Sequence, residues 1–285
     1  MPLTTIYAGG TRVIGDTTGI EQTLHPTVMD YINLLAQNGY SMSVNEIDAV
    51  NNLTHSLVSN GLWNKMQVVY PFIGNSANVM RFNLKDASSI NTFNITFTGT
   101  DFTFSTANGL RKTLATNGSW GNTNYTPSTH QTINDTHMSA YLGTSQAGTS
   151  VSLGCLQEPG FAWFVISSAN TPPLQAYYTI QSPLASAQYS YPGGINTGFV
   201  CGTRSGNNNR LFFNGILGAT STNSGTNRAN LPATIGVYNT NMQGRIFPCT
   251  QAIRMITIGT SLTDIDARNL YAIIQVYQTK LGRQV

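Results

Sequence analysis

The pattern of apolar and polar positions predicts two helices early in the chain. The first is expected to begin at Pro26, which suits the first turn of a helix, and to stop at Gly39. The second is expected to begin at Ser43, because Ser43 and Glu46 have the spacing of a capping box, and to end at Gly61, which suits a left-handed C-cap. Apolar residues recur at helical spacing at Val28, Met29, Ile32, Leu35 and Ala36, and again at Ile47, Val50, Leu53 and Leu57.

A third helix is predicted at the other end of the chain. Thr263 and Asp266 repeat the capping-box spacing, so this helix is expected to begin at about Thr263. Its apolar stripe consists of Leu270, Ile273, Ile274, Tyr277 and Leu281. A helix with such a stripe packs against another element of the protein.

After Trp63 the pattern changes to that of β-strands, with short segments separated by clusters of Gly, Asn, Ser and Pro. Residues 93–97 and 151–155 alternate in the period of a strand with one face in the core and one in water. Residues 161–166 are apolar throughout, which indicates a central strand covered on both faces, in our interpretation by the helical segment. The strongest hairpin signal is the Asn-Gly turn at residues 214–215, because both residue types adopt positive φ readily. A last strand is expected at Ile253, Met255 and Thr257.

Together these elements predict a mainly β protein, an antiparallel two-sheet β-sandwich or jelly roll with an N-terminal helical segment and a C-terminal helix. A sandwich of 285 residues can be a single domain. The expected organisation is an extended N-terminal arm over residues 1–25, a helical segment over residues 26–79, and a β-sandwich with its closing helix over residues 80–285.

The composition narrows the choice of partners. Charged residues make up only 9% of the chain, and the net charge of +3 comes from scattered lysines and arginines, so we expect no nucleic-acid binding. The longest apolar run, residues 161–166, is far too short to span a bilayer, and we expect no membrane insertion. The cysteines lack metal-ligand spacing and are expected to be buried free thiols; they are Cys155, Cys201 and Cys249.

Patterns that would indicate catalysis or a cofactor are missing from the sequence. No Gly-x-Ser-x-Gly elbow occurs, and the histidines His25, His55, His130 and His137 are interpreted as surface or hydrogen-bonded polar residues. The paired carboxylates Asp264 and Asp266 are explained by helix capping. We therefore predict that the chain is not an enzyme and uses no cofactor or metal. A calcium ion held by backbone carbonyls and one aspartate stays open as an alternative.

Loops rich in aromatic and amide side chains are the remaining candidates for a binding site. An aromatic face can stack on a pyranose ring while amides bind its hydroxyl groups. The candidate sugar-binding residues are Trp120, Tyr125, Tyr189, Tyr191, Asn207 and Asn208. The alternative is that these aromatic residues only close the ends of the sandwich.

Several stretches resemble bacteriophage virion proteins that carry a laminin-G or concanavalin-A-like sandwich. They are residues 60–66, residues 80–84, the hairpin at 210–215, and above all residues 258–264, 270–272 and 278–283. The resemblance covers residues 26–285 and implies a concanavalin-like jelly roll in a tail, a fibre or a head-decoration protein. It also implies assembly with other virion proteins and host-surface glycan binding, but it transfers no functional residue.

The sequence therefore predicts a phage virion structural protein that uses a lectin-like sandwich for assembly and attachment, located on the virion and assembled in the host cytoplasm. A homo-oligomer is expected, with a trimer as the specific guess. The first alternative is a carbohydrate-binding receptor-recognition module, and the second is a polysaccharide-degrading enzyme.

Overall fold

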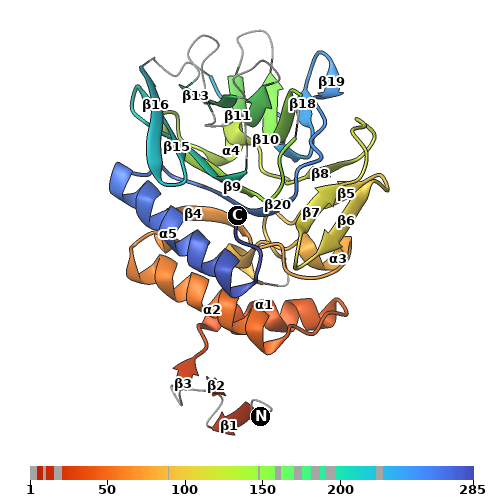
Figure 1. Ribbon diagram of the computed structural model, residues 1–285, viewed down its shortest axis with the longest axis vertical. Helices are drawn as coiled ribbons and strands as arrows, with labels where there is room; N and C mark the ends of the chain where they lie inside the picture. The colour runs from red at the N-terminus through yellow and green to blue at the C-terminus, as the bar shows by residue number, and fades with distance from the viewer. Residues whose placement is uncertain are drawn as a thin grey trace.

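The computed structural model describes residues 5–8, 11–15, 21–88, 90–146, 148–157, 162–169, 175–180, 187–190, 197–222 and 227–285, with the backbone alone for residues 5–22 and 162–190. In this part of the chain two large sheets form a β-sandwich, with helices packed beneath it (Figure 1). The predicted fold class is confirmed.

The first sheet has nine strands among the described residues. Its order is β13 (Ala187–Ser190), β12 (Gln175–Ile180), β11 (Ala162–Ala169), β10 (Ser150–Gln157), β17 (Thr234–Ile235), β8 (Trp120–Asn122) and β5 (Thr96–Thr98). The hairpin of β18 (Tyr238–Thr240) and β19 (Gly244–Ile246) joins it through parallel pairing of β18 with β10.

The second sheet has eight strands in the same described part of the chain. Its order is β16 (Ile216–Thr222), β15 (Asn208–Phe213), β14 (Gly198–Ser205), β9 (Asp135–Leu142), β20 (Ile253–Gly259), β7 (Gly109–Lys112) and β6 (Phe102–Ser105). The remaining strand, β4 (Met66–Tyr70), pairs with β20, so the region expected to be helical also supplies a strand of the sandwich. The predicted hairpin joins β15 to β16, with φ of 48° at Asn214 and 75° at Gly215.

Within the range expected to be an extended arm, the described backbone pairs as a small antiparallel sheet. Its strands are β1 (Thr5–Ala8), β2 (Thr11–Gly15) and β3 (Glu21–Thr23).

The long helices are α1 (Pro26–Gln37), α2 (Val44–Ser59) and α5 (Asp264–Lys280). Both predicted capping boxes are present, Ser43 with Glu46 and Thr263 with Asp266. Gly61 has φ of 70°, and the next backbone N–H donates to the Leu57 carbonyl at 2.8 Å, which confirms the left-handed C-cap. Short helical turns complete the described chain: η1 (Trp63–Lys65), α3 (Ala77–Met80), η2 (Leu84–Asp86) and α4 (Pro127–His130).

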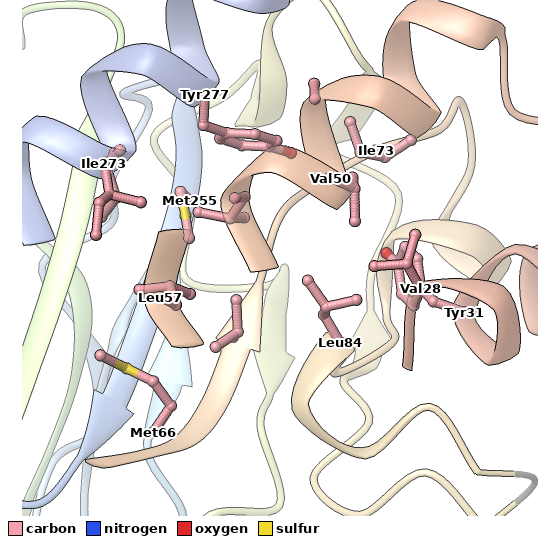
Figure 2. Close-up of a cluster of buried hydrophobic side chains, with 14 of the residues drawn as sticks. Val28, Tyr31, Val50, Leu57, Met66, Ile73, Leu84, Met255, Ile273 and Tyr277 are labelled. Carbon is pink, nitrogen blue, oxygen red and sulfur yellow. The ribbon is translucent and has the colours of Figure 1, made fainter. Parts of the chain in front are cut away.

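The helices cover the outer face of the eight-stranded sheet. Figure 2 shows Val50 and Leu57 of α2 and Ile273 and Tyr277 of α5 together with Met255 of β20 in one buried cluster. Large apolar side chains contribute about 1.5–3 kcal/mol each when fully buried. Helices and sheet therefore share a core and are expected to unfold together.

The expectation that the helical segment covers the strand at residues 161–166 is wrong. Phe161 lies outside the described residues, and Ala162–Ala169 form β11 in the nine-stranded sheet. The described strands covered on both faces belong to the eight-stranded sheet. In β20, for example, Met255 packs against the helices while Ile256 and Ile258 lie in the core between the sheets.

The strand predicted at residues 93–97 begins only at Thr96. Phe93 is in the left-handed region with φ of 64°, and the Ile95 N–H donates to the Arg81 carbonyl at 2.8 Å. The alternation of apolar and polar residues reflects side-chain burial here. The backbone of residues 93–95 lies outside the strand, and the Ile95 N–H bonds to the Arg81 carbonyl instead.

A buried arginine closes the C-terminal end. Arg283 is 2% exposed and donates to the backbone carbonyls of Pro71, Phe72, Thr106 and Arg254. Pro71 and Phe72 follow β4, Thr106 lies in the turn between β6 and β7, and Arg254 lies in β20. Arg283 thus joins the chain end after α5 to the eight-stranded sheet.

Candidate functional site

The candidate residues from the sequence lie in separate parts of the fold. Trp120 begins β8 in the nine-stranded sheet, whereas Asn207 and Asn208 lie at the turn between β14 and β15 in the eight-stranded sheet. Only the backbone of Tyr189 is described, in β13, and Tyr191 lies outside the described residues. Trp120 and the two asparagines are therefore on different sheets.

The structure corrects the prediction for Tyr125. Its side chain is fully buried, and its hydroxyl group donates to Oε1 of Gln67 at 2.6 Å. Its ring packs edge-on against Phe93, with centroids 5.0 Å apart. A ring enclosed in this way offers no face to a sugar, so Tyr125 is a core residue.

Asn207 and Asn208 are exposed. Hydrogen bonds made by neighbouring residues hold this turn in place without a ligand. Gly206 has φ of 59°, and its N–H donates to the Asn134 carbonyl at 2.8 Å. The buried Arg204 donates through Nε to Oδ1 of Asn134 at 2.7 Å. These bonds fix the hairpin, and the two amide side chains face solvent.

Trp120 belongs to a row of side chains on the outer face of β5 and β8. Thr98 pairs with Trp120 and Thr96 pairs with Asn122, so all four side chains point to the same side of the sheet. Phe97, which lies between the two threonines, points the other way and packs against the core between the sheets. The threonines are exposed, and Trp120 and Asn122 are partly exposed.

Arg245 of β19 lies against this row. The Cζ atom of its guanidinium is 3.6 Å from the centroid of the Trp120 ring, a close cation–π contact. The Nε atom is buried without a hydrogen-bond partner, while the two terminal nitrogens are not among the buried unbonded atoms. No carboxylate of the described residues forms an ion pair with Arg245.

The pKa of Arg245 agrees with a partly buried guanidinium that has no acidic partner among the described residues. The pKa of Arg245 is lowered because burial removes water from the guanidinium. Arginine stays protonated in spite of such a shift, since its usual pKa is far above neutrality. The site therefore carries a fixed positive charge with open N–H donors.

The hairpin that carries Arg245 is held on both sides. In β18, Tyr238 packs with Ile246 of β19 and with Val151 and Leu156 of β10. The Val151 N–H donates to the Phe247 carbonyl at 3.0 Å, just beyond β19. The guanidinium is therefore positioned before any ligand arrives, which lowers the entropy lost on binding.

The described residues contain no cluster of His, Cys, Asp or Glu metal ligands, and their three thiols are buried. No group of three or more His, Cys, Asp or Glu residues there could hold a metal ion. Cys155, Cys201 and Cys249 are free and buried, as predicted, and burial raises the pKa of each thiol. None of the described helices combines the length and apolar character needed to cross a membrane.

Sequence reasoning missed Arg245. The polar tip at residues 241–244 marks a hairpin, but nothing local indicates that this hairpin reaches a tryptophan on β8. The contact depends on strand order, which side-chain periodicity does not encode.

No protein-family model matches the chain, and no curated protein matches it. A mutant of Trypanosoma rangeli sialidase displaying trans-sialidase activity is similar in structure, with a TM-score of 0.53 and 13% identity over 96% of this chain and 44% of that chain. Domain 4 of a GH43 extracellular arabinanase from Geobacillus stearothermophilus has a TM-score of 0.45 and 16% identity, over 73% of this chain and 98% of that domain. The botulinum neurotoxin serotype D binding domain has a TM-score of 0.46 and 12% identity, over 74% of this chain and 52% of its own.

The likeness to the sialidase structure supports the fold. The chain spans 44% of the length of the first sialidase structure, and identities this low carry no residue roles across.

Proposed function

We propose that this protein is a carbohydrate-binding β-sandwich whose site is the outer face of β5, β8 and β19 around Trp120 and Arg245. The observation that carries the proposal is a positively charged, unpaired guanidinium stacked on a partly exposed tryptophan, beside a row of hydroxyl and amide groups. Such a surface supplies a planar cation held on an aromatic ring, together with the hydrogen-bond donors and acceptors that sugar recognition requires.

A glycan array probed with the full chain tests this proposal. The Trp120→Ala variant is expected to lose the signal on every glycan that the wild type binds, because it removes the ring that supports Arg245. Trp63→Ala is the matched control, since Trp63 is also partly exposed and also lies under a cation, with Nζ of Lys85 4.4 Å from its ring centroid. Trp63 lies beside the helical layer, so its loss is expected to leave glycan binding intact.

Absence of binding to every glycan on the array would overturn the proposal. Equal loss of binding in both variants, together with a lower unfolding temperature, would show that Trp120 acts through stability alone. We also propose that the protein binds without cleaving. Release of reducing sugar from a glycan that it binds would favour the enzyme alternative.

For the setting we propose a phage particle, in which the helical layer docks to the virion or to sister subunits and the nine-stranded sheet faces outward. The support is the sequence resemblance, strongest at residues 258–264 and 278–283, which contribute to β20, the cap of α5 and the buried Arg283. The helices and the Trp120 site lie on opposite outer faces of the sandwich.

Immunogold electron microscopy of gradient-purified particles tests the setting. Labelling at one fixed place is expected, and absence of the chain from purified particles would contradict it. Native mass spectrometry of the isolated chain measures the oligomer, for which a symmetric trimer is the proposal and a monomer would exclude self-assembly of the free chain.

A further inference from the structure

We infer that the Trp120–Arg245 site takes an acidic sugar, with the carboxylate of a uronic acid or a comparable sugar acid bound by the Arg245 guanidinium. This inference rests on the proposed carbohydrate-binding function and adds the chemical class of the ligand. Three features of the site carry it: the covered ring, the unpaired cation and the flanking polar row.

The covered ring argues against simple stacking of a neutral sugar. With Cζ of Arg245 3.6 Å from the ring centroid, the guanidinium occupies the position where a pyranose ring would stack. A ligand approaching this face of Trp120 meets a planar cation instead of an indole. The ring then serves as the support that holds the guanidinium in place.

The guanidinium of Arg245 differs from the paired cations of the described chain; an unbonded Nε beside an aromatic ring recurs only in Arg81 among the described residues, at the longer distance of 4.8 Å from the Phe82 ring centroid. Arg210 forms an ion pair with Asp264 at 3.0 Å, and Lys280 forms one with Asp48 at 2.6 Å. Arg283 is saturated by backbone carbonyls. The guanidinium of Arg245 has no hydrogen bond or ion pair with the described residues, although its Nε is already removed from water.

A carboxylate satisfies the N–H donors of the Arg245 guanidinium better than a hydroxyl group does. The guanidinium presents parallel N–H donors that match the two oxygens of a carboxylate, and such charge-assisted pairs are about twice as strong as neutral hydrogen bonds. Thr98 and Asn122, which flank Trp120 in the row, are then placed to bind the hydroxyl groups of the same sugar. The site therefore favours a ligand that carries both a carboxylate and several hydroxyl groups, as a sugar acid does.

The experiment uses matched acidic and neutral ligands. Uronic-acid oligosaccharides and the same oligosaccharides after reduction of the carboxyl group to the alcohol differ only in the proposed contact. Both sets are titrated into the full chain by isothermal calorimetry, with the wild type, Arg245→Gln, Arg245→Lys and Arg268→Gln. Arg268 is an exposed arginine of α5, so Arg268→Gln removes the same charge from the helical layer.

The wild type is expected to bind the acidic form about 10- to 100-fold more tightly than the reduced form, as a charge-assisted pair allows. Arg245→Gln is expected to abolish this preference, Arg245→Lys to retain only part of it because lysine lacks the planar fork, and Arg268→Gln to retain it fully. Raising the salt concentration should weaken binding of the acidic form alone, since the pair is partly exposed.

The outcomes separate this inference from the proposed function. Equal affinity for acidic and reduced forms, unchanged by Arg245→Gln, would overturn the acidic-sugar inference while carbohydrate binding stands. Failure of the wild type to bind either form, together with an empty glycan array, would overturn both. Near-ultraviolet circular dichroism of each variant verifies that the fold is intact.

Discussion

The buried His137 is expected to make the stability of the fold depend on pH. Its side chain projects from β9 and is fully buried, and Nδ1 donates to the Thr260 carbonyl at 2.5 Å. Because that carbonyl can only accept, Nε2 carries the lone pair and accepts from the Thr257 hydroxyl at 3.2 Å, which in turn lies 2.6 Å from Oγ of Ser139. The network satisfies a neutral imidazole, and no carboxylate among its hydrogen-bond partners would stabilise a charged one.

The magnitude follows from the pKa. Burial lowers the pKa of His137 from 6.5 to about 4. Below pH 6.5 the unfolded chain binds a proton at this histidine and the folded chain does not, so the free energy of unfolding falls as the pH drops toward 4 and levels off below that. The shift corresponds to a loss of about 3 kcal/mol between pH 7 and pH 4.

Urea unfolding at several pH values measures this effect. His137→Asn removes the titrating ring and keeps an N–H donor for the Thr260 carbonyl. The variant should be less stable at pH 7, but its stability should decline less steeply with falling pH than that of the wild type. Carboxylates with lowered pKa values, such as Glu46 and Asp266, also destabilise the fold on acidification, but they are common to both proteins and cancel in the difference.

Parallel stability curves for the wild type and His137→Asn between pH 7 and pH 4 would contradict this prediction. So would an NMR titration in which the His137 ring protonates near pH 6.5 while the protein is still folded. Either result would mean that the imidazole is solvated or that a neighbouring carboxylate, Asp135 or Asp266, offsets the burial.

Three further predictions concern the core. Arg283→Ala should lower the free energy of unfolding by at least about 3 kcal/mol, because several buried carbonyls lose their donor; Arg268→Ala, on the exposed side of α5, should change it by less than about 0.5 kcal/mol. Gly259→Ala should destabilise the fold or abolish soluble expression, since its Cβ would lie 1.8 Å from the Lys65 carbonyl oxygen, and full stability of that variant by thermal unfolding would contradict the packing. The cysteines should resist Ellman's reagent at pH 8 in the folded protein and react in denaturant, because their thiols are buried with raised pKa values.

Local signals predicted the helix caps and the hairpin turn correctly, because the bonds that form them join residues close in sequence. The capping boxes at Ser43 and Thr263 and the turn at Asn214 depend on bonds between near neighbours, and each forms as expected. Tyr125 shows the limit of this reasoning. Its Asn-rich surroundings indicated a surface loop, but its burial depends on Phe93 and Gln67, which are distant in sequence.

The prediction of which strand the helices cover was wrong for the same physical reason. An apolar run predicts a strand with both faces covered, but it does not say which strand the helices cover. The helices cover the eight-stranded sheet, in which β20 pairs with β4 and β9 over long sequence separations. Trp120 and Arg245 meet through the same kind of long-range order, so no spacing rule within the sequence could have paired them.

The low charge content makes an unpaired cation at the surface of this protein unusual. Only 9% of the residues are charged, and several of the described cations, such as Arg204, Arg254 and Arg283, are buried and committed to groups of the protein itself. A protein that places so few charges at its surface gains little from a guanidinium that is stacked, partly desolvated and unpaired, because desolvation of a charge costs free energy. A ligand carboxylate would recover that cost at the moment of binding. The site on the nine-stranded sheet is therefore better explained by recognition than by stability, whereas the ion pairs near the helices, Lys65 with Asp266 and Lys280 with Asp48, are explained by the fold alone.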